Sequence, residues 1–129
     1  MTIQVLYLDT HVLVWLYAFG IHGVSDRAAE QLEAAQSLVI SPMVLLETEY
    51  LYETEKIRYP SSVMSHYLFE HIALTVCSKP FQRVAAKALE MKWTRDPFDR
   101  LITAQASLDQ DFLVTKDRTI HDHYQQAIW

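Results

Sequence analysis

Residues 5–19, VLYLDTHVLVWLYAF, join a short apolar run to a longer one through a single acid. Val5–Leu8 has the length and composition of a strand that is buried in a sheet. The longer run, Thr10–Phe19, continues as a buried helix or as a longer strand, and hydrophobic periodicity does not decide between them. Similar short runs predict further strands at Leu38–Ile40, Ile72–Val76, Phe112–Val114 and Ala127–Trp129, the last of them an edge strand.

Helix-starting residues stand between these strands. A capping serine or aspartate, or a proline that fits the first turn of a helix, marks each predicted start. The predicted helices run from Ser25 as N-cap to about Gln36, from Ser41-Pro42 through Leu51, from Ser62 after Pro60 to Phe69, from Pro80 to about Met91, and from Asp96-Pro97 to about Ser107. Short strands separated by helices imply βαβ crossovers. We therefore expect an α/β protein, a three-layer α/β/α sandwich with a central, mostly parallel sheet covered on both faces.

Size and composition limit the classes of protein to consider. The chain has 129 residues, 50% of them hydrophobic, and we expect one domain covering residues 1–129. The longest apolar run, Val12–Gly20, is shorter than the roughly 20 residues that cross a bilayer, and no basic segment precedes it as in a cleaved leader. The single cysteine, Cys77, cannot form an internal disulfide. A cytoplasmic protein with no membrane partner is expected.

Four acids fall where the predicted strands end or where the following helices begin. Asp9 directly follows the first predicted strand, and Asp117 lies shortly after the strand that ends at Val114. Glu47 lies about two turns into one predicted helix, and Asp99 lies in the first turn of another. Ligands of parallel sheets bind beyond the carboxyl ends of the strands. We therefore expect all four acids at one edge of the sheet.

Each acid also has a purely structural interpretation. Asp9 fits the N-cap of a helix that begins at Thr10, and Asp99 would stabilise the dipole of its own helix by ~0.3–1 kcal/mol. Asp117 suits a turn, and Glu47 suits a solvated helix surface. None of these roles requires the acids to meet. If they do meet, each pair ~5 Å apart costs about 3 kcal/mol at an effective dielectric near 20, which one or two Mg²⁺ or Mn²⁺ ions would offset.

The overall charge bears on the kind of substrate. A net charge of -5 argues against a nucleic-acid partner, because phosphate binding is driven by excess Lys and Arg. That objection weakens if the acids surround cations that reverse the local charge. A metal ion held by carboxylates can lower the pKa of a water, orient it and neutralise a phosphate. The residues therefore predict phosphodiester hydrolysis without a nucleophilic side chain, since Cys77 lies in an apolar segment and no Ser/His/Asp set is evident.

Four segments of the chain resemble the motifs of the PIN-domain family, and within it those of the VapC-like toxins of bacterial type II toxin–antitoxin pairs. These segments are Leu6–His11, Ile40–Pro42 followed by Glu47, Arg95–Ala106 and Leu113–Asp117. Any one of them is a weak signal, whereas four in order within this length are specific.

The resemblance implies an Mg²⁺-dependent endoribonuclease, with Mn²⁺ able to substitute, that acts on RNA. It also implies a central parallel sheet, a homodimer and a small antitoxin protein that blocks the site. By position, the resemblance makes Asp9, Glu47 and Asp99 the metal-binding acids and Asp117 a fourth acid, which varies more within the family.

Other polar residues near these acids are expected to support them. Asp96 is expected first as a helix cap and second as a neighbour that supports Asp99. The hydroxyl groups of Thr115 and Ser41 are expected to hold the acids or the waters of the metal. Basic residues that flank the acids are expected to bind the phosphates on either side of the scissile one, or else to pair with neighbouring acids at the surface. These basic residues are Arg95, Arg100, Lys116 and Arg118.

Histidines and aromatic residues are given mainly structural interpretations. His121 and His123 would share a face only in a strand, and no third ligand is near them in the sequence, so a zinc site is not expected. For His11 a hydrogen-bonded structural role is favoured over a place in the site. Most of a group of aromatic residues are expected in the core, and the rest at a dimer or antitoxin surface. The group comprises Trp15, Tyr17, Tyr50, Tyr52, Tyr67 and Phe69.

Three other functions are weighed against the ribonuclease toxin. A PIN-type nuclease could act in RNA processing or on structured DNA, although no nucleic-acid module is appended to the chain. A noncatalytic RNA-binding or scaffold domain of the same fold is disfavoured because all four expected acids are present. A phosphatase with an aspartyl nucleophile would need a second Asp two residues after Asp9, where His11 stands.

Overall fold

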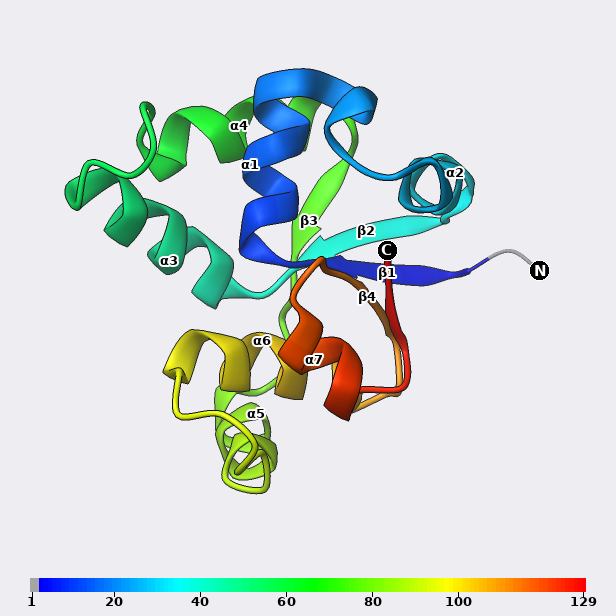
Figure 1. Ribbon diagram of the computed structural model, residues 1–129, viewed down its shortest axis with the longest axis vertical. Helices are drawn as coiled ribbons and strands as arrows, with labels where there is room; N and C mark the ends of the chain where they lie inside the picture. The colour runs from blue at the N-terminus through cyan, green and yellow to red at the C-terminus, as the bar shows by residue number, and fades with distance from the viewer. Residues whose placement is uncertain (1–2) are drawn as a thin grey trace.

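In the computed structural model, which describes residues 3–129, strands and helices alternate along the chain (Figure 1). The strands are β1 (Val5–Leu8), β2 (Ser37–Ile40), β3 (Leu74–Val76), β4 (Phe112–Val114) and β5 (Ala127–Ile128). The helices are α1 (Thr10–Phe19), α2 (Asp26–Ala34), α3 (Pro42–Glu53), α4 (Ser61–His71), α5 (Phe81–Ala88), α6 (Pro97–Ser107) and α7 (Arg118–His123), with a short 3₁₀ helix, η1 (Gly20–Gly23), after α1.

The strands form one parallel sheet in the order β3-β2-β1-β4-β5. β1 is central: Leu6 pairs with Leu38 of β2 on one side and with Phe112 of β4 on the other. The chain moves from β1 outward through β2 to β3 and then crosses to β4, so the strand order reverses between β1 and β4. Open parallel sheets bind ligands at such a reversal. β5 is an edge strand, as predicted.

Helices cover both faces of this sheet (Figure 1). The helices α1 to α4 lie on one face, and α5, α6 and α7 lie on the other. This is the predicted three-layer α/β/α arrangement. Although α3 and α6 belong to opposite layers, they contact each other, and each of them carries one of the candidate acids.

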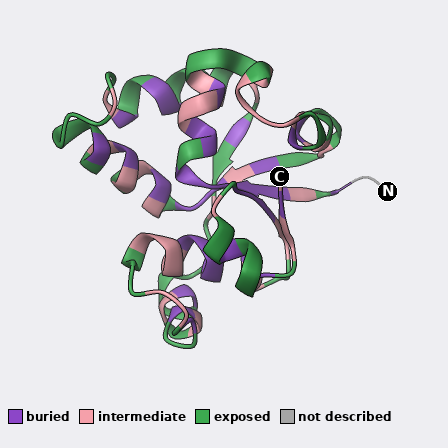
Figure 2. Ribbon diagram, in the orientation of Figure 1, coloured by how far each residue is buried: buried purple, intermediate pink, exposed green. Residues whose placement is uncertain are grey.

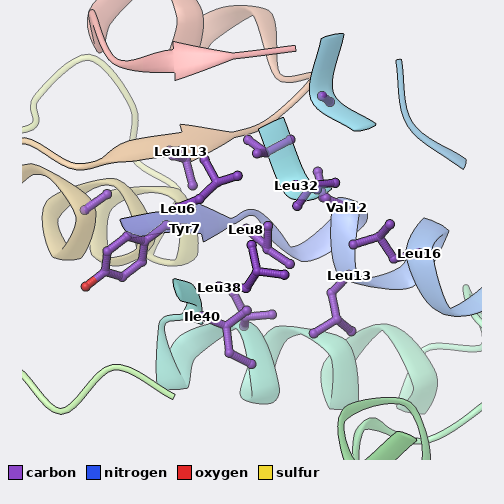
Figure 3. Close-up of a cluster of buried hydrophobic side chains, with 14 of the residues drawn as sticks. Leu6, Tyr7, Leu8, Val12, Leu13, Leu16, Leu32, Leu38, Ile40 and Leu113 are labelled. Carbon is purple, nitrogen blue, oxygen red and sulfur yellow. The ribbon is translucent and has the colours of Figure 1, made fainter. Parts of the chain in front are cut away.

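The core lies between the sheet and its helices. Leu6, Tyr7 and Leu8 of β1 are all buried, and because side chains alternate along a strand, Tyr7 faces the layer opposite to its two neighbours. Figure 2 shows buried residues along the strands and on the inner sides of the helices. Figure 3 shows the side chains that α1 adds to this core, namely Val12, Leu13 and Leu16.

The segment that periodicity left open, Thr10–Phe19, is helix α1. Asp9 has extended backbone and caps its first turn. Gly20 ends the helix with a φ of 63°, a left-handed conformation that glycine adopts without a Cβ clash. Its N–H donates to the carbonyl oxygen of Leu16 in the last turn. The residues at the start and the end of this segment therefore indicate a helix, which hydrophobicity alone did not.

Some predicted boundaries differ from those observed. β3 begins at Leu74 instead of Ile72, because the N–H of Ile72 still bonds to the last turn of α4. α2 ends at Ala34 and α5 at Ala88, both earlier than predicted. Cys77 lies just after β3 and is only partly buried.

Helix α7 is missing from the predictions. It spans 6 residues with one buried side chain, Ile120, which is too short a segment for hydrophobic periodicity to reveal. Within residues 3–129, none of the helices has the length and apolar character needed to cross a membrane.

Candidate active site

The ends of β1 and β4 place two of the candidate acids side by side. Asp9 directly follows β1, and its N–H donates to the carbonyl oxygen of Val114, the last residue of β4, at 3.0 Å. Asp117 follows β4 after a two-residue link, Thr115 and Lys116. Because β1 and β4 are neighbours where the strand order reverses, Asp9 and Asp117 lie at the same edge of the sheet.

A pocket of about 400 Å³ brings all four candidate acids together. Its lining residues come from the start of α1, from α3, from the start of α6 and from the segment after β4: Asp9, His11, Val12, Trp15, Glu47, Asp96, Asp99, Lys116 and Asp117. Asp96 adds a fifth carboxylate to the four, and Lys116 is the one lysine or arginine in the lining. We call this hollow the acid pocket.

Asp9 is the one buried acid among residues 3–129. Its carboxylate accepts hydrogen bonds from the N–H of Thr10 at 2.8 Å and from the hydroxyl of Thr115 at 2.6 Å. Burial raises the pKa of Asp9, and these two hydrogen bonds oppose the rise. Asp9 therefore caps α1, as the structural interpretation has it, and also lines the acid pocket.

Glu47 reaches the acid pocket from the middle of α3. One of its carboxylate oxygens accepts a hydrogen bond from the hydroxyl of Thr10 at 2.5 Å, so Thr10 contacts both Asp9 and Glu47. Burial raises the pKa of Glu47, while this hydrogen bond lowers it. Glu49, two residues further along, instead accepts from the N–H of Ser61 at the start of α4. The two glutamates of α3 thus have different roles, and Glu47 is not a simple solvated carboxylate.

Asp99 has the pKa that is most clearly tied to the other acids. Burial, together with the negative charges of Asp96, Asp9, Asp117 and Glu47 in that order, raises the pKa of Asp99 to about 7. Asp99 lies in the first turn of α6, and Asp96 caps that helix by accepting from the N–H groups of Phe98 and Asp99 at 2.8 and 3.2 Å. The acids are therefore close enough to repel one another.

Asp117 is an N-cap and not the turn residue of the structural interpretation. Its carboxylate accepts from the N–H of Ile120 at 3.0 Å and so begins α7. Its own N–H donates to the hydroxyl oxygen of Thr115 at 3.0 Å, and Thr115 in turn donates to Asp9. Thr115 is fully buried and holds both acids, as expected from the sequence.

Ser41, which was given the same supporting role, is placed elsewhere. Its hydroxyl accepts from the N–H of Met43 at 3.1 Å and caps α3. Ser41 is buried but does not line the acid pocket. Its hydroxyl therefore contributes to the helix that carries Glu47.

The four basic residues that flank the acids in the sequence have different surroundings in the structure. Lys116 lines the acid pocket. Arg95 and Arg100 line another depression of about 460 Å³ with Leu89 and Lys92, and Arg100 donates to the carbonyl oxygen of Thr94 at 2.9 Å. Arg118 is an exposed residue at the start of α7. In the described part of the chain, none of the four forms a salt bridge with a carboxylate.

His121 and His123 have different neighbours. The Nε2 atom of His121 is 2.6 Å from the carbonyl oxygen of Thr115, whereas the ring of His123 stacks on Trp93. His11, for which a structural role was favoured, lines the acid pocket instead. Assigning Thr10–Phe19 as a helix from the sequence would have predicted this position of His11, because α1 starts beside Asp9 and turns the side chain of His11 toward the same opening.

The group of aromatic residues assigned mostly to the core is not buried. Tyr50, Tyr52 and Tyr67 are exposed, and the remaining three are partly exposed. That expectation is wrong because leucine, isoleucine and valine side chains fill most of the space between a small sheet and its helices. Tyr17 and Phe69 pack against the edge of the core, and the other four aromatic side chains are available at surfaces.

Oxygen ligands in the acid pocket fit a hard divalent cation such as Mg²⁺. Across residues 3–129, no three His, Cys, Asp or Glu side chains have the geometry to hold an ion directly. Mg²⁺ usually keeps several of its waters and contacts only one or two carboxylates, so a pocket of about 400 Å³ with separated acids suits a hydrated ion. The mutual repulsion at Asp99 is the observation that such an ion would relieve.

This repulsion sets an expected pH dependence of stability. In the folded protein Asp99 keeps its proton up to about pH 7, whereas its ordinary pKa is 3.8, so between these values the folded state binds more protons than the unfolded state. Without divalent cations, the free energy of unfolding should therefore fall by roughly 1–3 kcal/mol as the pH rises through that window. Urea unfolding in EDTA at pH 5 and pH 8 measures it, and should show one cooperative transition.

Asp99→Asn is the control for that measurement, because it removes the titrating group. It should flatten the dependence, although Asp9 and Glu47 act in the same direction. Equal or greater stability of the unsubstituted protein at pH 8 would contradict crowding of the acids.

Comparisons with known proteins show the family to which the chain is similar. A family model described as the PIN domain matches residues 6–125, which include all four motif segments. Ribonuclease VapC22 from Mycobacterium tuberculosis is 36% identical to the chain over 118 residues, which cover 90% of this chain and 89% of that protein.

Solved structures share the fold over nearly the whole chain. VapBC2 from Rickettsia felis, in a structure bound to a DNA fragment from its promoter, matches with a TM-score of 0.62 and 16% identity, covering 97% of this chain and 96% of that one. A toxin–antitoxin complex from Klebsiella pneumoniae matches with a TM-score of 0.64 and 19% identity, covering 95% of each chain. At these identities the likeness bears on the fold alone.

Proposed function

The chain belongs to the PIN-domain family, and from this membership we propose that it is a metal-dependent endoribonuclease and the toxin of a type II toxin–antitoxin pair. The observation that carries the proposal is the acid pocket, in which carboxylates from α3, α6 and the ends of β1 and β4 share one hollow. The similarity to a protein named ribonuclease VapC22 supports RNA as the substrate, and a cytoplasmic location accompanies that substrate.

Asp9, Glu47, Asp99 and Asp117 are the residues that would hold the ion, some of them through its waters. When bound, Mg²⁺ would lower the pKa of a water and offset charge on the phosphate that the water attacks. The chain supplies the positions of the carboxylates. Thr115 and Thr10 fix the orientation of the Asp9 carboxylate through their hydrogen bonds, and orientation of this kind preserves metal affinity.

Protons and the cation compete for these carboxylates. The pKa of Asp99 is about 7, so at neutral pH this side chain carries a proton part of the time and must release it when a cation enters. The carboxylate of Asp117 uses one oxygen, Oδ1, to cap α7, which leaves the other oxygen for the acid pocket. Asp96, occupied with two backbone N–H groups, adds negative charge beside Asp99.

Glutamates 47 and 49 of α3 provide a matched test of the proposal. Glu47→Gln should lower the rate of RNA cleavage roughly 100-fold, because the amide can still accept the hydrogen bond of Thr10 but lacks the charge that holds a cation. Glu49→Gln changes the same residue type on the same helix outside the acid pocket and should cleave normally. The measurement is Mg²⁺-supported cleavage of single-stranded RNA by the purified chain, freed of any copurifying protein. Equal rates for the two variants would argue against the site.

We also propose an antitoxin as the protein partner. Both structural neighbours come from toxin–antitoxin systems, and a hollow of about 680 Å³ in this chain is an apolar groove formed by α1, the segment before α4 and α4 itself. Exposed aromatic side chains line it, as is common at interfaces: Phe19, Tyr59 and Tyr67, with Tyr17 partly exposed. Copurification with a small protein encoded beside the chain tests this assignment, which falls if substitutions in the groove leave that association unchanged.

A homodimer is proposed as well. Large hydrophobic side chains remain exposed outside the groove, on α3 and at the two ends of α5, and contact between two copies would remove them from water. They are Leu46, Tyr50, Phe81 and Leu89. Light scattering of the purified chain at micromolar concentration distinguishes a dimer from a monomer.

A further inference from the structure

One rim of the acid pocket differs from the rest in carrying aromatic rings and the pocket's single cationic side chain. Lys116, His11 and Trp15 line the pocket there. The Nζ atom of Lys116 lies 5.9 Å from the centre of the Trp15 ring and 5.8 Å from that of Trp129, within the range of a cation–π contact. Lys116 is thereby held over the aromatic rings and is not paired with a carboxylate in the described part of the chain.

The ring of Trp15 is held in place from several sides. The indole of Trp129, next to the end of β5, meets it edge-on at 5.6 Å, and the imidazole of His11, one turn earlier on α1, lies 5.8 Å away at 42°. The backbone beneath is fixed as well, because a Cβ on Gly23 would come within 2.6 Å of the carbonyl oxygen of Trp15. A ring held in this way loses little conformational freedom when a ligand stacks on it.

Packing of the core does not account for Trp15. Among the described residues, Trp129 and Trp93 pack against the hydrophobic core, but Trp15 is not one of the side chains that do so. Trp15 is only partly buried; it lines the acid pocket together with the exposed His11, and it also lines the apolar groove. A large aromatic surface without a role in the core thus adjoins the carboxylates.

We propose that His11, Trp15 and Lys116 form a nucleotide subsite, in which an unpaired base stacks on the aromatic rings and Lys116 binds a phosphate next to the scissile one. This inference rests on the proposed ribonuclease function and assigns the residues beside the acid pocket that contact an unpaired nucleotide. Stacking on aromatic side chains requires a base that is free of its duplex partner. It also tolerates any base, so the subsite selects for unpaired RNA and not for one sequence.

The test measures binding apart from cleavage. Asp99→Asn is used as the background that does not cleave, and the binding of a fluorescein-labelled single-stranded RNA is followed by anisotropy in Mg²⁺. Adding Trp15→Leu should raise the Kd roughly tenfold, while Trp15→Phe, which keeps a ring, should retain most of the affinity. Tyr52→Leu removes an exposed aromatic side chain that lines neither the acid pocket nor the apolar groove and should leave the Kd unchanged.

Two further readouts separate stacking from loss of structure. Moving an abasic site along the RNA strand identifies the nucleotide that stacks. RNA that lacks the base at this position should bind weakly, and Trp15→Leu should not weaken its binding further. Lys116→Gln should reduce the slope of log Kd against log salt by about 0.7, the value for one phosphate contact on a single strand. A defect of Trp15→Leu that is equally large on abasic and intact RNA would overturn the subsite.

The outcomes for the subsite and for the nuclease are distinguishable. Suppose that the unsubstituted chain cleaves RNA, while Trp15→Leu and Lys116→Gln do not change the binding of single-stranded or duplex RNA by the Asp99→Asn background. The subsite is then wrong and the nuclease proposal stands. If the unsubstituted chain neither binds nor cleaves RNA, the nuclease proposal falls and takes the subsite with it. Preferential loss of single-stranded binding in Trp15→Leu supports both.

Discussion

Asp9→Asn is expected to lower RNA cleavage by at least about a thousandfold, which corresponds to ~4 kcal/mol of lost transition-state stabilisation. Asp9 is the most enclosed carboxylate of the acid pocket, and its hydrogen bonds from Thr10 and Thr115 fix the direction in which its charge points. Asparagine has nearly the same shape but cannot supply the negative charge that a divalent cation requires. The measurement is the initial rate of RNA cleavage in Mg²⁺.

The substitution should leave the fold intact, which allows the loss to be assigned to the site. The side-chain oxygen of asparagine can still accept the N–H of Thr10 and cap α1. Because burial raises the pKa of Asp9, removing its charge should leave the free energy of unfolding at pH 8 unchanged or higher.

Asp111→Asn provides the matched control. Burial also raises the pKa of this aspartate, but it pairs with Lys79 at 3.4 Å away from the acid pocket. It should cleave RNA at the normal rate. If Asp9→Asn also cleaved normally, the chain would be better described as a noncatalytic domain that keeps the fold.

The sequence predicted the strands well because their ends carry strong local signals. Val5–Leu8 and Phe112–Val114 were placed at their observed bounds, since each is a short apolar run that ends near a polar residue. The ends of α2 and α5 were less certain, because the last turns of both helices give way to residues that would also suit a helix. Periodicity could not assign Thr10–Phe19, whose helical form depends on its cap at Asp9 and on packing against the sheet.

The candidate acids were predictable because parallel strands all end at one edge. Once Asp9 and Asp117 were placed after β1 and β4, their proximity followed from the order of the strands. What the sequence did not reveal were contacts set by side-chain direction. His11 and Trp15 lie four residues apart, so their side chains come into contact only if their segment is a helix. Ser41 could not be separated from Thr115 without knowing where their hydroxyl groups point.

Removal of divalent cations is expected to have an effect as large as that of Asp9→Asn. Treatment with EDTA should lower cleavage at least about a thousandfold, and added Mg²⁺ or Mn²⁺ should restore it. The physical reason is that burial and the negative charges of the neighbouring acids raise the pKa of Asp99 to about 7, and the one lysine that lines the acid pocket, Lys116, cannot balance those acids. Cleavage that persists at the same rate in EDTA would contradict the proposed chemistry.

The same ion should also stabilise the fold, and the pH dependence of that effect identifies where it binds. At a hundred times its dissociation constant, Mg²⁺ is expected to raise the free energy of unfolding by ~2.7 kcal/mol. Protons compete with the ion for Asp99, so the gain should be larger at pH 8 than at pH 5. Asp99→Asn should lose most of the gain at both pH values, whereas Asp111→Asn should keep it. A gain that is the same in all three proteins would place the ion outside the acid pocket.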